Sequence, residues 1–158
     1  MDRKMDKDMR TAFWRAFHAS PVIMMRLANI PGHAEPMTAQ LDQDAHHAIW
    51  FYTRRNNRIA SGGAATGEVA TLQHEVFASL SGVLVEETDA AVRAQHWSNA
   101  VEAWFPEGLG DREVVMLRFD IEDAEVWTAH LGVKGAFRLL TGKPIDQESA
   151  GEHAVGSV

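Results

Sequence analysis

The chain has 158 residues, of which 46% are hydrophobic and 23% are charged, and it contains no cysteine. This is the composition of an ordinary globular domain, and the lack of cysteine excludes disulfide bonds, thiolate catalysis and thiolate metal sites. The formal net charge of -7 argues against general affinity for nucleic acid or anionic membranes, and no stretch reaches the about 18 apolar residues of a membrane span.

The first half of the sequence has the hydrophobic spacing of one helix followed by several strands. Apolar residues recur every three or four positions ahead of Ser20 and Pro21, which is typical of an amphipathic helix that ends before a proline. The later apolar segments are short and are separated by turn signals. The predicted elements are a helix over 2–18, strands over 21–28, 35–41 and 48–53, a loop over 42–47, and a short basic helix over 54–65.

The second half is predicted to form a hairpin, a helix and two further strands. Asp89 has the short polar side chain that caps a helix. Trp97, Val101 and Trp104 give that helix an apolar face. The predicted elements are strands over 68–74 and 76–86, a helix over 90–103, a loop over 105–111, strands over 114–121 and 124–128 with a turn at 122–123, and a helix over 135–140.

The strands follow one another without regular helical crossovers. This order favours a mainly β (α+β) fold, an antiparallel barrel with peripheral helices, over a doubly wound parallel sheet. We expect one domain over 1–158. The polar, small residues of 145–158 are expected to form a flexible tail. The absence of cysteine and of a signal peptide fits a cytoplasmic location.

The sequence contains no motif for a metal site or an activated nucleophile. Its eight histidines do not form a His-Glu-x-x-His pattern, and adjacent His46 and His47 would point to opposite faces of a strand. No serine lies in a Gly-x-Ser-x-Gly elbow. Adjacent acids such as Glu86 and Glu87 are interpreted as solvated turn charges. We therefore predict no metal site and assign no catalytic residue.

Three arginines follow an aromatic strand in this acidic chain. Arg54, Arg55 and Arg58 come directly after Thr53, at the end of the predicted strand 48–53. Guanidinium groups form charge-assisted bidentate bonds with phosphate, and a threonine hydroxyl adds a neutral donor. The segment is therefore either a phosphate site or a solvated basic segment that balances nearby acids.

Trp104 and Phe105 are adjacent, so they cannot both face one core from a regular element. One of the two side chains must point elsewhere. It could form an aromatic wall for a planar ligand or contact another subunit. Ordinary packing beneath a loop is the equally simple alternative.

Several of these segments together resemble a known family. The strand pair Glu35–Ala39 and Ile49–Thr53 resembles the flavin-binding core of the pyridoxamine 5'-phosphate oxidase-like split barrels. Segments 81–86, 103–108 and 124–127 are similar to the general stress protein branch of that superfamily. The resemblance covers 11–144 in the right order.

The resemblance implies a six-stranded antiparallel split β-barrel with peripheral helices, which forms a homodimer and holds FMN in a groove between its subunits. It departs from the oxidase branch at Glu35, where a cation is usual; this carboxylate is expected to face solvent or an arginine. The implied cofactor contacts are Met37 and Thr38 at the isoalloxazine edge, Trp50, Phe51, Tyr52 and Thr53 beside the ribityl chain, Arg54 and Arg58 at the phosphate, and Trp104 and Phe105 from the other subunit over the ring.

The implied function is that of an FMN-binding general stress protein, a flavin-dependent oxidoreductase of unassigned substrate and electron donor. Flavin would supply the redox chemistry, which agrees with the lack of a catalytic acid or base motif. Three alternatives remain open. They are a non-catalytic dimer that stores or senses flavin, a relative that binds a deazaflavin or haem, and a barrel-shaped interaction module.

Overall fold

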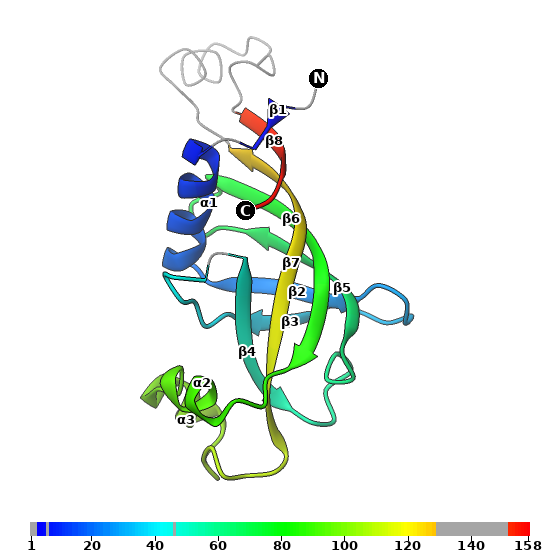
Figure 1. The fold of residues 1–158 in the computed structure, drawn as a ribbon, viewed down its shortest axis with the longest axis vertical. Coiled ribbons are helices and arrows are strands. Elements are labelled where there is room, and N and C mark those ends of the chain that lie inside the picture. Colours follow the sequence, from blue (N-terminus) through cyan, green and yellow to red (C-terminus); the bar gives the residue numbers. More distant parts are fainter. Residues whose placement is uncertain (1–2, 6, 46, 129–151) are drawn as a thin grey trace.

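The computed structural model describes residues 3–5, 7–45, 47–128 and 152–158. Figure 1 shows their elements coloured along the chain. The elements are β1 (Arg3–Lys4), α1 (Lys7–Ala19), β2 (Val22–Leu27), β3 (Glu35–Thr38), β4 (Ala48–Arg54), β5 (Gly63–Ala70), β6 (Val76–Glu86), α2 (Ala90–Gln95), α3 (Asn99–Trp104), β7 (Val114–Thr128) and β8 (Glu152–Gly156).

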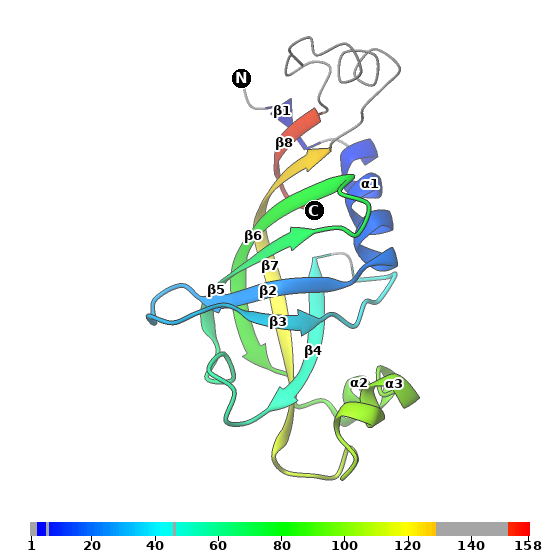
Figure 2. The same ribbon diagram turned by 180° about the vertical axis from the view of Figure 1, so that it is seen from behind.

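Strands β2 to β7 form a barrel that Figures 1 and 2 show from opposite sides. Neighbouring strands follow the order β3-β2-β5-β6-β7-β4, and every neighbouring pair is antiparallel. Helices α1, α2 and α3 lie outside the strands. The prediction of a six-stranded antiparallel split barrel with peripheral helices is confirmed.

The barrel is split between β3 and β4. One bridge joins Gln40, which follows β3, to Trp50 of β4 through backbone hydrogen bonds of 2.7 and 3.1 Å. Beyond this bridge the two strands diverge, because β4 runs steeply across the direction of β2 and β3 (Figure 1). Over Glu35–Thr38, the only described strand that pairs with β3 is β2. One edge of β3 is therefore open.

The main hydrophobic core lies inside the barrel and beneath α1. Met9, Phe13 and Phe17 recur at four-residue spacing and are buried on one face of α1, as the sequence pattern predicted. Along β2, exposed and buried residues alternate strictly, so that every second side chain enters this core. The helix thus covers one end of the strands with the stripe that its sequence provides.

A second, smaller hydrophobic cluster lies between the outer face of the barrel and helices α2 and α3. Trp50 and Tyr52 of β4 pack there with Met116 of β7 and Val101 of α3. Consequently β4 is buried on both faces, since its alternate residues enter the main core. This double burial explains the nearly continuous apolar run over Ala48–Tyr52.

β7 is one continuous strand over Val114–Thr128, so the turn predicted at 122–123 is wrong. The pairing with β6 shifts register between Ser81 and Gly82, which leaves Glu122 without a partner on β6. This extra residue makes a β-bulge, whose polar residues imitate a turn signal in the sequence. A Cβ at Gly82 would lie 2.0 Å from the carbonyl oxygen of Asp120, so the close approach of the strands requires glycine there.

The short helix predicted over 54–65 is also wrong. The segment consists of tight turns, in which the N–H of Asn57 donates to the carbonyl of Arg54 and that of Gly62 donates to Ile59. The Asn57 side chain also accepts from the N–H of Ile59, at 3.0 Å. Gly62 and Gly63 have φ of 71° and 107°, and this left-handed backbone starts β5 in place of ending a helix.

The single helix predicted over 90–103 is divided into α2 and α3. Asp89 caps α2, as predicted, by accepting from the N–H groups of Ala91 and Val92 at 2.8 and 3.3 Å. Ser98 starts α3 by accepting from the N–H of Val101 at 3.3 Å. This second cap lies inside the predicted helix, so the chain turns between the two helices.

The two ends of the chain differ from expectation. The first helix begins at Lys7, not at residue 2, because Arg3–Lys4 pair in parallel with β8. Part of the expected tail forms β8, which pairs with β7. The helix predicted over 135–140 lies outside the described residues. Within the described ranges, no helix has the length and apolar character to cross a membrane.

Candidate functional site

The open edge of β3 has backbone N–H and carbonyl groups that form no hydrogen bonds with another described strand. The N–H of Ala39 donates to Pro21, so hydrogen-bonded pairs between β2 and β3 recur at every second residue, including Met37. Thr38 lies between these positions, and its N–H and carbonyl therefore face away from β2. Among the described residues, no strand pairs with this edge over Glu35–Thr38 except β2 on the opposite side.

The same reasoning places unpaired backbone groups on β4. Trp50 exchanges hydrogen bonds with Gln40 across the split, so the N–H and carbonyl of Tyr52, two residues on, face the same way. If the pairing of Gln40 with Trp50 continued along both strands, Tyr52 would pair with Thr38. These two described residues are not paired. The split thus offers hydrogen-bond donors and acceptors on both sides, which water or a ligand must satisfy.

The side chains of the two predicted β3 residues point to opposite faces. Met37 is buried in the main core, whereas Thr38 is exposed. A ligand at the outer face of β3 can therefore contact the side chain and the free backbone groups of Thr38. Met37 has its backbone groups paired with β2 and contributes to the shape of the site from beneath.

The four predicted residues of β4 also divide between two environments. Phe51 is fully buried inside the barrel. Trp50 and Tyr52 lie beneath α2 and α3, where Trp50 stacks on His96 with a centroid distance of 5.1 Å. Thr53 is buried as well. These four side chains pack within the chain itself, so a ligand at the split can reach the free backbone edge of β4 but not these side chains.

Tyr52 has a strongly perturbed side chain. Its hydroxyl donates to the carbonyl of Arg93, and burial raises the pKa of Tyr52 to about 12, although the positive charge of Arg93 acts in the opposite direction. Because the folded-state pKa is raised, the associated stability is present below about pH 10 and is lost as pH rises towards about 12.

We expect the phenol to titrate with a midpoint near 12 in the folded protein and near 10 after unfolding in denaturant. The chain has one tyrosine, so the near-ultraviolet absorbance of tyrosinate reports Tyr52 alone. The Tyr52→Phe variant should lose this signal, and its unfolding free energy should fall less than that of the wild type above pH 10. A folded-state midpoint near 10 would contradict the burial of the hydroxyl.

The three arginines that follow β4 each have an acidic partner. All three side chains are about half exposed, and each partner comes from a different part of the chain. The solvated alternative of the sequence analysis, in which the segment balances nearby acids, describes this arrangement. The pairs are Arg54 with Asp111 at 3.8 Å, Arg55 with Glu86 at 3.3 Å, and Arg58 with Glu35 at 2.6 Å.

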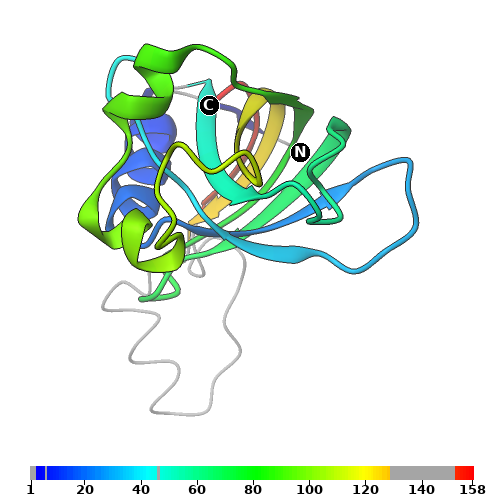
Figure 3. The same cartoon turned by 90° about the horizontal axis from the view of Figure 1, so that it is seen from below.

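Trp104 and Phe105 point in different directions, as their adjacency required. Phe105 packs beside Trp97 at a centroid distance of 6.3 Å, and the guanidinium of Arg54 lies 5.6 Å from its ring centre. Trp104 is 79% exposed, although it was predicted on the apolar face of its helix. In Figure 3, α2 and α3 (green) lie at one side of the barrel and the β2–β3 loop (blue) at the other.

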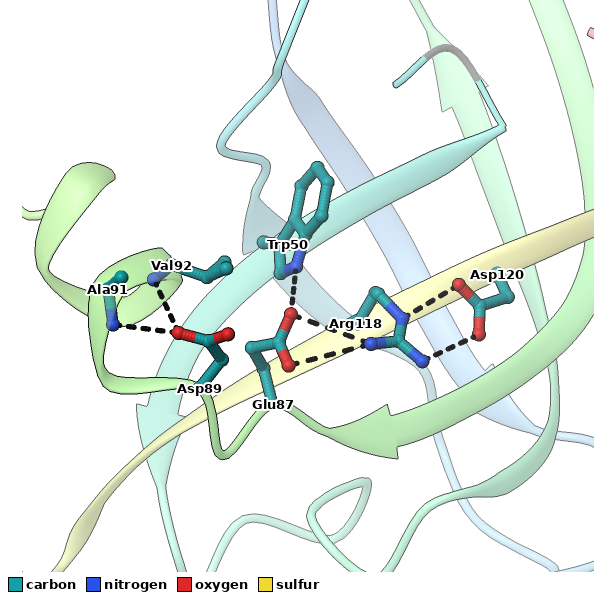
Figure 4. A network of polar contacts seen from close by, with 7 residues as sticks. All are labelled: Trp50, Glu87, Asp89, Ala91, Val92, Arg118 and Asp120. Atoms are coloured by element: carbon teal, nitrogen blue, oxygen red, sulfur yellow. Dashed lines mark hydrogen bonds and ion pairs between the residues drawn. The ribbon is translucent and has the colours of Figure 1, made fainter. Parts of the chain in front are cut away.

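A buried polar network beside Trp50 was not predicted (Figure 4). Glu87 is only 8% exposed, so its interpretation as a solvated turn charge is wrong. It accepts from the Trp50 indole at 3.1 Å and from Arg118 at 3.5 Å. The two-point hydrogen bond of Arg118 with Asp120, at 2.9 and 3.2 Å, is the main cause of a raised Arg118 pKa. Only Trp50 of this network was a predicted site residue.

The outer face of the sheet carries an exposed apolar patch. Val22 and Met24 of β2 line a hollow of about 430 Å³ with Phe77 of β6 and Trp127 of β7. We call these four residues the outer patch. Thr38 lies opposite Val22 in the β2–β3 register, so its exposed side chain shares this face. A contiguous apolar patch on an exposed face is typical of an interaction surface.

Solved structures of similar proteins cover most of the chain. A protein of Jannaschia sp. CCS1 described as general stress protein 26 is 26% identical, with a TM-score of 0.79 over 97% of this chain and 100% of that one. The general stress FMN/FAD binding protein of Xanthomonas citri is 33% identical, with a TM-score of 0.75 over 81% of this chain and 94% of that one. A general stress family protein of Xanthomonas campestris pv. campestris is also 33% identical, with a TM-score of 0.74 over 83% and 94% of the two chains.

A comparison with curated protein sequences finds no significant match. The family model for pyridoxamine 5'-phosphate oxidase-like proteins, in contrast, matches residues 8–148, which is most of the chain. Family model, fold and similar structures agree with the resemblance seen in the sequence. The chain therefore belongs to the pyridoxamine 5'-phosphate oxidase-like family, in its general stress protein branch.

Proposed function

We propose that this protein is a homodimer that binds a flavin, FMN in the first instance, at the split between β3 and β4. The observation that carries the proposal is the pair of facing, unpaired strand edges at Thr38 and Tyr52. The isoalloxazine ring has a row of hydrogen-bond donors and acceptors along one edge, and such a row fits free backbone groups. The 33% identical protein of Xanthomonas citri, an FMN/FAD binding protein, supports the choice of flavin.

The residues present fit the ring end of a flavin better than its phosphate end. Thr38 offers an exposed side chain and free backbone groups. Thr53 and Arg54 end the neighbouring strand, and Arg54 pairs with Asp111 across 3.8 Å, beyond hydrogen-bonding distance. Arg54 and Arg58 are the two candidates for a phosphate contact, but each already has an acidic partner that balances its charge. The close contact of Arg58 with Glu35 is considered below.

The outer patch provides the dimer contact in this proposal. Four of the large exposed apolar side chains of the described residues gather in it, on the face that also carries Thr38. A second copy of the chain seated there would close the outer side of the open β3 edge. Trp104 of that second copy then supplies the aromatic cover over the ring, because its own subunit leaves it 79% exposed.

A bound flavin would supply the redox chemistry of an oxidoreductase, and the protein would bind and orient it. No substrate or electron donor is assigned. If flavin in the purified protein is reduced by NADH or NADPH, the oxidoreductase assignment is supported. If it resists both, the storage or sensing alternative becomes the better description.

The proposal is tested by titrating the apo-protein with FMN while recording the quenching of flavin fluorescence. We expect saturation at one flavin per subunit, with a dissociation constant of about 1 µM or lower. Trp104→Ala should weaken binding by up to about tenfold, since an aromatic stacking contact contributes about 0.5–1.5 kcal/mol.

Leu72→Ala is the matched control, because Leu72 is similarly exposed, at 78%, but lies in the β5–β6 turn. It should bind FMN like the wild type. Absence of saturable binding by the wild type would refute the flavin assignment. Equal weakening by both substitutions would refute the role of Trp104.

A further inference from the structure

Glu35 lies against the arginine that is best placed for a second phosphate contact. Oε1 of Glu35 and Nε of Arg58 form an ion pair across 2.6 Å, which is the shortest arginine–carboxylate distance found between described residues. A hydrogen bond of 3.3 Å runs from the Arg58 guanidinium to the carbonyl of His33. One ion pair and one hydrogen bond thus hold the Arg58 guanidinium against Glu35, at the start of β3, and His33, just before it.

This arrangement changes what Arg58 can do for an incoming anion. A guanidinium holds phosphate best through two parallel N–H donors. In Arg58 one terminal nitrogen already donates to the carbonyl of His33, and the carboxylate of Glu35 lies against Nε. A phosphate dianion beside Arg58 would also approach the negative charge of Glu35, at a distance where like charges repel appreciably. Glu35 therefore neutralises Arg58 and disfavours a second anion.

The position of Glu35 makes this effect specific to one end of the ligand. Glu35 begins β3, and Thr38 with its free backbone groups lies three residues further along the same strand. The Glu35 backbone itself belongs to a hydrogen-bonded pair with β2, so the side chain alone faces Arg58. Charge repulsion from Glu35 would act on a phosphate and leave an uncharged ring at Thr38 unaffected.

We propose that Glu35 occupies the anion subsite of Arg58, so that the flavin site of this protein does not select for the terminal phosphate. This inference rests on the flavin-binding function proposed above. It predicts that the ring supplies the affinity, and that riboflavin, which carries a hydroxyl group where FMN carries a phosphate, binds about as well as FMN. The chemical class of ligand is then a flavin recognised through its isoalloxazine ring.

The test compares FMN with riboflavin in fluorescence titrations of the wild type and of Glu35→Gln. In the wild type the two dissociation constants should agree within about threefold. Glu35→Gln keeps the size of the side chain and one acceptor oxygen but removes the charge. It should tighten FMN binding by about tenfold and leave riboflavin binding unchanged.

Two further variants separate the role of Arg58 from a general effect of charge. Arg58→Gln should change FMN affinity less than about threefold in the wild type, but should abolish the gain in the Glu35→Gln background. Glu86→Gln removes the carboxylate that pairs with Arg55, the residue directly after β4, and should leave the ratio of the two dissociation constants unchanged. All four side chains of these two ion pairs are partly exposed, so the fold should be retained.

The outcomes distinguish the two proposals. If neither flavin binds to any variant, the proposed function fails and this inference fails with it. If both bind, but the wild type prefers FMN by tenfold or more and Arg58→Gln removes that preference, the inference is overturned and flavin binding stands. Equal gains from Glu35→Gln and Glu86→Gln would also overturn it, because the effect would then be one of net charge.

Discussion

Replacing Arg118 with methionine is expected to lower the free energy of unfolding by about 3 kcal/mol. Glu87 is buried, and after this change the only partner left to its carboxylate, among the described side chains, is the Trp50 indole. A buried charge without its counter-ion is strongly destabilising, because its desolvation is no longer offset. Arg118 is about one-third exposed, which places the estimate at the lower end for a buried pair.

Chemical denaturation monitored by tryptophan fluorescence measures this effect. Arg55→Met is the matched control, since Arg55 pairs with the neighbouring Glu86 in a more exposed setting, and it should cost less than about 1 kcal/mol. The Glu87→Gln, Arg118→Met double variant should regain part of the loss, because a neutral amide can still accept from Trp50. Equal costs for Arg118→Met and Arg55→Met would show that Glu87 is solvated.

Much of the barrel could be predicted from patterns within short segments of the sequence. The burial of β2 alternates strictly, and the hairpin of β5 and β6 has its turn at 71–75, close to the predicted position. Asp89 caps a helix through contacts two and three residues away. Each of these features depends on a few residues that are close together in the sequence, so the sequence alone indicates them.

Features that depend on distant parts of the chain were missed. The side of β7 that carries Val114 and Met116 is buried only because α2 and α3 cover it. The polar residues at 122–123 read as a turn because β-bulges and turns share this composition, and the pairing with β6 decides between them. The region 54–65 was predicted as a short helix, but three tight turns and two left-handed glycines lead it into β5.

The candidate site shows the same division. Its basic segment and exposed tryptophan are visible in the sequence, and so is the unusual Glu35. The partners of the arginines are not, because Glu35, Glu86 and Asp111 reach the end of β4 from three separate segments. The free edges at Thr38 and Tyr52 are also invisible, since they follow from the register of β2, β3 and β4. The sequence thus supplies the chemical groups, and strand register determines which of them a ligand can reach.

A charged substitution in the outer patch is expected to have the largest effect on function. In Phe77→Glu, a carboxylate would replace one of the patch side chains directly opposite Trp127 on β7. A desolvated, unpaired charge at an interface disfavours association by several kcal/mol. If the wild type is the proposed homodimer, we expect the variant to be monomeric at the same concentration, as measured by light scattering after size-exclusion chromatography.

Loss of the dimer should then remove the flavin site as a whole. If Trp104 reaches the ring from the second subunit, Phe77→Glu should weaken FMN binding at least as much as Trp104→Ala does, although Phe77 itself need not touch the ligand. Leu72→Glu adds the same charge at an exposed apolar residue outside the outer patch, and should remain dimeric and bind FMN. A monomeric variant that binds FMN as tightly as the wild type would place the whole site within one subunit. A wild type that is itself monomeric would refute the proposed dimer, and with it the roles of the outer patch and of Trp104.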